Sequence, residues 1–273
     1  MEQIKYPYYQ ININSFCTTE IYVDDVIVDE WKGIETKGIE RNSSLTPINH
    51  VLLQSGKHKI KGRMFPRYGE KYLTEQNSYL GIEFFVASIQ NLKNSRVSFH
   101  PKIESPWDGL SENIKYPYFE INTEIEVELP FILDGWQNSV NLSEMKSEEL
   151  LKEVLNYYQQ IRLVLKEHNA AKYLEMSQEK MKLQEQAFYF DAERKKSFLD
   201  GATQLFSQKL EVEELIADNL KLEIMGNGKL VRLMRNDDTH ALQFKSKDIE
   251  KQSNVEFEIK LHRRMSGNEL SII

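Results

Sequence analysis

Proline and glycine are distributed very unevenly along this chain of 273 residues. All seven prolines fall at or before Pro130, and residues 137–200 contain neither proline nor glycine. Proline breaks helices and both residues mark turns, so this distribution indicates a change of structural class inside one chain. The sequence therefore predicts a first part made of short strands and a second part that begins with helices.

Short segments of alternating apolar and polar residues run through the first part. Ile11 and Ile13, and later Ile21 and Val23, alternate with polar neighbours, as in strands that bury one face. A tight hairpin is predicted over residues 22–28, because the central pair of aspartates tolerates unusual turn dihedrals. Short strands separated by turns favour a β-sandwich. Further strands are predicted at residues 51–53, 57–65, 80–89, 96–103 and 118–129.

One motif occurs twice in the chain. The segment Ile4–Asn12 returns at Ile114–Asn122, with seven of nine residues identical. A recurrence at a period near 110 residues suggests two units that each begin with the same β element. Pro7 and Pro117 fix their own φ and push the preceding tyrosine into extended geometry. We therefore predict that each copy enters a strand just after its proline.

The repeat also suggests where one domain ends and the next begins. We predict a β-sandwich domain over residues 1–110 and an α+β domain over residues 111–273, because the repeat implies two equivalent openings. The second copy leaves an alternative open, since residues 118–129 could instead complete the first sandwich.

The second part is predicted to contain helices over residues 147–217 and an antiparallel sheet over residues 219–273. Ser147 is a candidate N-cap, followed by two glutamates and an apolar stripe at helical spacing. The pair His168-Asn169 predicts a break, after which a second helical run reaches about Phe206. Helices followed by an antiparallel meander indicate an α+β fold. Three further details are expected: an interruption near 200–201, a short helix at 212–217 and one strand across 255–261.

Composition excludes several classes of function. The net charge is −7, whereas nucleic-acid-binding proteins usually carry a strong basic surface, so no nucleic-acid partner is expected. Cys17 is the only cysteine, which excludes an internal disulfide and a cysteine-cluster metal site. No run of about 18 apolar residues predicts a membrane span. The start lacks the apolar core of a signal peptide, so a cytoplasmic location is expected, or a periplasmic or envelope-associated one if Met1 replaces a removed leader.

One predicted strand carries four cations on a single face, because alternate side chains of a strand share a face. These candidate partner-binding residues are Lys57, Lys59, Lys61 and Arg63, with Arg67 just beyond the strand. Like charges repel, so such a row suits docking of an acidic partner or a phosphate. Two alternatives stay open: a face exposed only to solvent, and pairing inside the protein with an acidic row formed by the same rule, Glu124, Glu126 and Glu128.

The three tryptophans predict different roles. Trp107 lies in the turn-rich segment Ser105–Gly109, where an exposed aromatic can anchor a protein interface or stack on a sugar. It is therefore a further candidate partner-binding residue, with a lid over one end of the sandwich as the alternative. The likeness between the two copies continues, with one gap, to Asp29-x-Trp31 and Asp134-x-Trp136. Packing in a core is expected for both of these tryptophans.

The sequence contains no catalytic signature. The six histidines lack the spacings of helical zinc sites, and there is no nucleophile elbow, phosphate-binding loop or dinucleotide fingerprint. Asp24-Asp25 and Asp237-Asp238 look like paired carboxylates for hydrolysis, but both lie in predicted turns, where aspartate is favoured for backbone reasons. The run His262–Arg264 is expected in a surface turn, with an anion site as the alternative. No enzyme activity, cofactor or metal is predicted.

The layout resembles that of bacterial immunity proteins that neutralise secreted toxins. The likeness rests on an acidic chain without catalytic motifs and on a terminal meander from Gly228–Leu233 through His262–Gly267. The order of helices followed by a meander also resembles the broad cystatin-like or NTF2-like class, whose curved sheets host pockets or interfaces. These resemblances imply a binding function but transfer no individual functional residue.

The leading hypothesis is a non-enzymatic protein that occludes a partner protein, which the resemblance suggests is a toxin effector. The alternatives are an envelope or carbohydrate-binding β-sandwich module and an enzyme with a pocket in the α+β domain. A broad charged patch would favour the protein partner, and an aromatic platform around Trp107 would favour a sugar. A deep polar pocket lined by His240 or His262 with a carboxylate would favour the enzyme.

Overall fold

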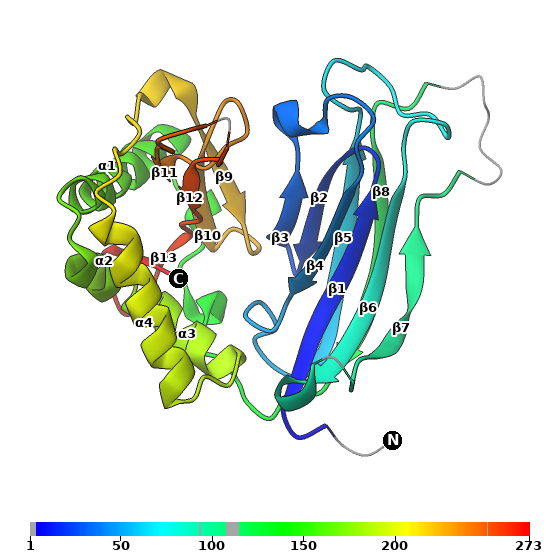
Figure 1. Cartoon of the computed structure of the whole chain (residues 1–273), viewed down its shortest axis with the longest axis horizontal. Helices are drawn as coiled ribbons and strands as arrows, with labels where there is room; N and C mark the ends of the chain where they lie inside the picture. Colours follow the sequence, from blue (N-terminus) through cyan, green and yellow to red (C-terminus); the bar gives the residue numbers. More distant parts are fainter. Residues whose placement is uncertain (1–3, 93, 108–114, 250) are drawn as a thin grey trace. The chain divides into compact units, whose positions relative to one another are not determined.

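The computed structural model describes residues 4–92, 94–107, 115–249 and 251–273. The fold is mixed, with antiparallel sheets and helices in the same chain (Figure 1). It divides into two compact units, which we call unit 1 and unit 2. Unit 1 comprises the chain up to Leu133 together with Ala187–Tyr189, and unit 2 comprises Asp134–Gln186 and Phe190–Ile273.

Unit 1 contains two four-stranded antiparallel sheets (Figure 1). The first has the order β4-β1-β6-β7, with β1 at Pro7–Ser15, β4 at Asn42–Pro47, β6 at Leu80–Ser88 and β7 at Val97–Glu104. The second has the order β3-β2-β5-β8, with β2 at Thr18–Val23, β3 at Val26–Trp31, β5 at Gly56–Phe65 and β8 at Phe119–Val127. Short 3-10 helices occur at Gly33–Thr36 and Ile89–Asn91.

Side chains of the two sheets meet directly. A Cβ atom added to Gly62 of β5 would lie 2.9 Å from Leu80 Cδ2 and 3.2 Å from Ile82 Cδ1 of β6, so a larger residue there would displace these side chains. Near the other edge, His100 Nε2 of β7 lies 2.8 Å from Thr123 Oγ1 of β8. Many apolar side chains of both sheets are buried, among them Ile11, Ile13, Ile60, Ile82 and Ile125, and this burial is the main source of stability for such a fold.

The hairpin between β2 and β3 forms where the sequence predicts it. Asp24 and Asp25 have φ angles of 47° and 66°, which are the left-handed values that a two-residue hairpin turn requires. This turn reverses the chain tightly and brings β3 into register beside β2. The turn geometry therefore accounts for the presence of two aspartates here, as the sequence predicts.

Both copies of the sequence repeat lie in unit 1. The first copy begins β1 at Pro7 itself, and the second begins β8 two residues after Pro117. β1 and β8 belong to different sheets, and β8 pairs along its whole length with β5. The compact units therefore divide near residue 133, whereas we predicted a division at residue 110. The two positions differ because β8 pairs with β5 and so belongs to unit 1.

Residues 187–189 join unit 1 from a distant part of the sequence. The side-chain amide of Asn49 donates to the carbonyl of Ala187 at 3.1 Å and to that of Pro7 at 2.9 Å. The hydroxyl of Tyr189 donates to the same Pro7 carbonyl at 3.2 Å. The Tyr189 ring also packs edge-on against Tyr6. A buried polar side chain thus ties together two segments more than 130 residues apart.

Unit 2 begins with helices. They are α1 at Ser147–Lys166, α2 at Ala170–Met176, α3 at Gln178–Ala187 and α4 at Ala192–Ser207. The predicted break after α1 is confirmed, since His168 has a φ of 53° and Asn169 caps α2 by accepting from the Lys172 amide. The second run is broken at Ser177 and near Tyr189, and α4 continues through Gly201, where we predicted an interruption. No helix in the described ranges is both long and apolar enough to cross a membrane.

The sheets of unit 2 follow the helices. A four-stranded sheet has the order β14-β13-β10-β9, with β9 at Leu220–Met225, β10 at Leu230–Arg235, β13 at Leu261–Arg263 and β14 at Leu270–Ile272. A two-stranded sheet pairs β11 at Leu242–Phe244 with β12 at Val255–Phe257. Three 3-10 helices occur at Trp136–Asn138, Leu142–Glu144 and Ala217–Asn219. The strand predicted across 255–261 is thus two short strands.

Tyr158 connects helix and sheet in the core of unit 2. The apolar stripe of α1 is buried, as predicted, and Tyr158 is 1% exposed at its centre. Its hydroxyl donates to the carbonyl of Ile259 at 2.6 Å and accepts from the amide of Leu233 in β10 at 3.0 Å. Both backbone groups are buried and depend on this hydroxyl, because a buried polar group without a partner is costly.

Two more predicted elements differ from the structure, and one strand was not predicted. Residues 51–53 form a turn and its continuation instead of a strand, while β4, which was not predicted, completes the first sheet. Residues 212–216 are extended where a short helix was expected, and Val212 forms an isolated bridge with Phe244. In each case the tertiary partner decides the local structure more than intrinsic preference does.

Candidate functional site

The four predicted cations of β5 share one face of the sheet β3-β2-β5-β8. Along β5, buried residues alternate with exposed or half-buried ones. Lys57 and Lys59 are exposed, Lys61 and Arg63 are half-buried, and His58 lies buried on the opposite side. The strand period of two therefore places the cations as predicted. We call this surface, together with the outward side chains of β2 and β8, the charged face.

Two of the cations pair with carboxylates of β8. Lys57 Nζ lies 2.8 Å from Glu124 Oε1, and this contact raises the pKa of Lys57. Arg63 Nε lies 3.3 Å from Glu120 Oε2. The Tyr118 hydroxyl donates to the same carboxylate at 2.5 Å and lowers the pKa of Glu120. Pairing within the protein, one of our two alternatives, thus describes this part of the face, although Glu120 was not part of the predicted acidic row.

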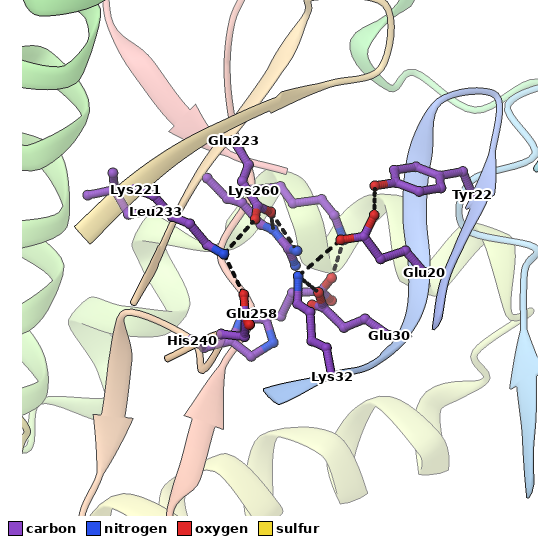
Figure 2. A network of polar contacts seen from close by, with 12 residues as sticks. Glu20, Tyr22, Glu30, Lys32, Lys221, Glu223, Leu233, His240, Glu258 and Lys260 are labelled. Atoms are coloured by element: carbon purple, nitrogen blue, oxygen red, sulfur yellow. Dashed lines mark hydrogen bonds and ion pairs between the residues drawn. The ribbon is translucent and has the colours of Figure 1, made fainter. Parts of the chain in front are cut away.

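The outward side chains of β2 add further neutralising groups. Lys61 Nζ lies 3.5 Å from Asp25 Oδ1 and 4.7 Å from the centre of the Tyr22 ring. The Arg63 guanidinium lies 5.0 Å from the same ring. Figure 2 shows the Tyr22 hydroxyl directed at Glu20, to which it donates at 2.7 Å. Polar and buried residues alternate along β2, and this pattern is the sequence signal that could have placed Glu20 and Tyr22 on the charged face.

Lys59 differs from the other three cations. It stands directly opposite Glu124 in the register of β5 and β8, but that carboxylate is engaged by Lys57. Across the described ranges, the Lys59 ammonium group has no ion pair, and only its backbone amide is bonded, to Asp24 Oδ1 at 2.9 Å. The charged face therefore presents one exposed cation whose charge is not matched by a neighbour.

Arg67 is not available to a partner, which corrects its prediction as a docking residue. It is only 3% exposed. Its Nε donates to the carbonyl of Thr36 at 2.9 Å and its Nη2 to the carbonyl of Glu40 at 3.0 Å. The guanidinium also lies 4.3 Å from the centre of the Phe16 ring. Arg67 lies beyond the end of β5, where strand alternation no longer determines which way a side chain points.

Trp107 is held in place and does not form an open platform. It is half-buried, its Nε1 donates to the carbonyl of Ser78 at 2.8 Å, and its ring packs edge-on against Phe119 at 5.2 Å. This arrangement agrees with the lid alternative. Trp31 and Trp136 are 9% and 8% exposed, so both are buried as expected.

His58 forms a buried ion pair beneath the charged face. Its Nδ1 lies 2.6 Å from Asp24 Oδ2 and its Nε2 lies 2.9 Å from the carbonyl of Gln54. Both partners only accept hydrogen bonds, so the doubly protonated ring satisfies both. Burial by itself lowers the pKa of His58, but the hydrogen bond and the charge of Asp24 outweigh it and raise the pKa overall.

Unit 2 contains a second polar cluster centred on Glu179. His262 Nε2 lies 3.1 Å from Glu179 Oε2, and His262 Nδ1 lies 2.8 Å from Ser139 Oγ. Arg264 Nε donates to Glu179 Oε1 at 2.6 Å, and Ser271 Oγ donates to Glu179 Oε2 at 2.9 Å. Burial raises the pKa of Glu179, but the bonds from His262, Arg264 and Ser271 outweigh it and lower the pKa to about 2.

The Glu179 cluster contains serine, histidine and glutamate in contact, which is the composition of a hydrolase triad. However, Ser139 is 3% exposed and His262 is fully buried, so neither reaches solvent where a substrate would bind. A nucleophile must also approach the atom that it attacks. The arrangement is therefore a structural network, and the expectation that His262 lies in a surface turn is wrong. The anion beside it is the protein's own Glu179.

No family model, curated protein or solved structure matches this chain. Among the described residues, no group of three or more histidine, cysteine, aspartate or glutamate side chains could hold a metal ion. The function must therefore be argued from the surfaces themselves.

Proposed function

We propose that this chain is a non-enzymatic protein that binds and occludes an acidic partner protein, as immunity proteins do with toxin effectors. We further propose that the two sheets of unit 1 are the layers of a β-sandwich that presents the charged face. The observation that carries the proposal is Lys59, an exposed cation that has no ion pair with any described residue, in a row whose other members are paired with carboxylates.

Charge complementarity supports this assignment over the alternatives. An unmatched surface cation attracts an acidic partner at long range and increases the rate of association. The neighbouring pairs hold mixed charges at fixed positions, which favours one orientation of docking and disfavours partners with the wrong pattern. The triad-like residues of unit 2 are buried, and Trp107 forms no open platform, so neither supports catalysis or sugar stacking.

The test begins with genomic context. Products of the genes adjacent to the one encoding this chain would be expressed, assayed for toxicity, and tested for neutralisation and direct binding by the intact protein. We expect one of them to be toxic, acidic on its binding surface and neutralised by this chain. Failure of every neighbouring product to bind would contradict the proposal.

The variant Lys59→Glu then locates the interface. We expect a several-fold slower association, with a smaller difference at high salt, because exposed charges act through screened long-range attraction. Lys61 is left unchanged because it pairs with Asp25. The matched control is Lys182→Glu, which reverses another exposed lysine, on α3 in unit 2. Equal effects of the two reversals would show that only net charge matters and that the charged face is not the interface.

A further inference from the structure

Unit 1 contains a cleft at the end of the first sheet that none of the sequence predictions anticipated. It has a volume of about 490 Å³, which lies within the range of small-molecule sites. Three segments form it: the end of β1, the start of β4 and the loop that leads into β6. The lining residues used below are Ser15, Phe16, Arg41, Asn42, Glu75 and Gln76.

The walls of the cleft are fixed by buried contacts. Arg67 binds the carbonyls of Thr36 and Glu40 and thereby holds the loop that leads into Arg41 and Asn42. The backbone amide of Phe16 donates to the carbonyl of Tyr79 at 2.8 Å, which joins two walls. A cleft whose walls are already ordered loses less conformational entropy when a ligand binds.

Several polar groups in the cleft have unused bonding capacity. Within the described part of the chain, the side chains of Arg41, Glu75 and Gln76 make no hydrogen bond or ion pair, although Arg41 lies 5.4 Å from the Phe16 ring centre. Ser15 is only 2% exposed, and its Oγ is buried without a partner. The Ser15 hydroxyl lies behind the surface of the cleft, so the groups that a ligand can reach are the exposed side chains of Arg41, Glu75 and Gln76.

The charge of the lining indicates the class of ligand. One cation, Arg41, and one carboxylate, Glu75, balance each other, and the remaining polar groups are amides and hydroxyls. A balanced lining does not favour a phosphate or another anion. Phe16 and Tyr79 supply apolar surface beside these donors and acceptors. We propose that this cleft binds a neutral saccharide, whose hydroxyl groups both donate and accept and whose ring carbons cover the aromatic surface.

This proposal is independent of the charged face and is tested separately. The intact protein would be titrated with cellobiose, maltose and N,N′-diacetylchitobiose at millimolar concentrations and followed by amide NMR shifts. We expect one of them to shift the amides of residues 14–16, 41–43 and 75–79. Shifts of these amides by inorganic phosphate or by the dipeptide Gly-Gly instead would overturn the saccharide assignment, as would no response to any of the three sugars.

Two variants connect the response to the cleft. Arg41→Gln and Glu75→Gln each remove one charged group, and we expect each to weaken saccharide binding about tenfold, since a hydrogen bond to a charged group contributes about 1.5 kcal/mol. Both side chains are exposed, so melting temperatures should stay unchanged. Lys182→Gln serves as the matched control. Saccharide binding that is unaffected by both cleft variants would overturn the proposal.

Discussion

The charged face of unit 1 and the Glu179 cluster of unit 2 use the same kinds of groups in different surroundings. On the charged face, the side chains of Lys57 and Glu124 are 67% and 44% exposed. In the Glu179 cluster, His262 is fully buried and Glu179 is 27% exposed. Water competes with the first set and is largely excluded from the second. Ion pairs of similar length in the two regions should therefore contribute very different amounts to the free energy of unfolding. The charged face, being exposed, is the region that we propose for binding a partner.

The largest effect should come from removing Glu179. The variant Glu179→Ala leaves the buried His262 without a carboxylate and Arg264 with Asp134 alone, and we expect a loss of about 3 kcal/mol in the free energy of unfolding. Urea denaturation followed by helical circular dichroism would measure it. The control Glu175→Ala removes an exposed carboxylate one turn earlier and should cost less than about 0.5 kcal/mol. Similar losses of stability in the two variants would contradict the expected difference between a buried and an exposed carboxylate.

The same carboxylate should make unit 2 sensitive to acid. The folded-state pKa of Glu179 lies at about 2, below its ordinary value of 4.5. A lowered pKa contributes stability that is present above pH 4.5 and is lost as the pH falls towards 2. We expect Glu179→Gln to flatten the dependence of unfolding free energy on pH in this window. An unchanged acid profile in that variant would assign the acid sensitivity to other carboxyl groups.

A somewhat smaller effect is expected from Tyr158→Phe. The change keeps the ring but removes the hydroxyl that bonds the Ile259 carbonyl and the Leu233 amide, leaving both buried groups unsatisfied. We expect a loss of about 2 kcal/mol. Denaturation gives the value, and Tyr157→Phe on the adjacent position of α1 is the control, since no hydrogen bond to its hydroxyl occurs among the described residues. Equal stability of the two variants would contradict the assigned role.

Unit 1 should show a weaker dependence on pH of opposite sign. Because Asp24 raises the pKa of His58, the stability gained from this pair is fully present below the ordinary histidine pKa of about 6.5. It is lost as the pH rises through the raised folded-state pKa. Amide hydrogen exchange of β2 and β5 at a series of pH values would detect the change. Asp24→Asn keeps the hydrogen-bonding shape without the charge and should remove most of the dependence.

The smallest effect should occur on the charged face. Lys57→Ala breaks the exposed pair with Glu124, and we expect no measurable change in melting temperature because such pairs are solvated. Thermal unfolding provides the measurement. A clear drop in melting temperature would mean that this pair stabilises the sheet and that the two regions differ less than their exposure indicates.

Local patterns predicted the parts of the fold that depend on local physics. The hairpin at Asp24, the alternation along β5, the apolar stripe of α1 and the break at His168 all follow from backbone preference or periodicity. β4 was missed because its sequence, Asn-Ser-Ser-Leu-Thr-Pro, has little strand preference and is held by pairing with β1. The two helix breaks near Ser177 and Tyr189 likewise lack proline or glycine to mark them.

The candidate sites also depend on contacts between residues far apart in the sequence, which local patterns do not predict. The cations of β5 could be placed on one face from their spacing, but the unmatched charge of Lys59 depends on which carboxylate Lys57 engages. Arg67 was misjudged because its partners are backbone carbonyls at residues 36 and 40, which carry no sequence signal. The cleft combines three segments separated in sequence, so no local pattern points to it.

The placement of Ala187–Tyr189 in unit 1 has a consequence for synthesis on the ribosome. The rest of unit 1 ends at Leu133, yet its final three residues are made 54 to 56 residues later. At roughly 5–20 residues per second, translation needs about 3 to 11 s to reach them. During that interval, the Asn49 amide and the Pro7 carbonyl lack partners that they have in the finished protein. The nascent N-terminal half is therefore incomplete until most of the helices have emerged.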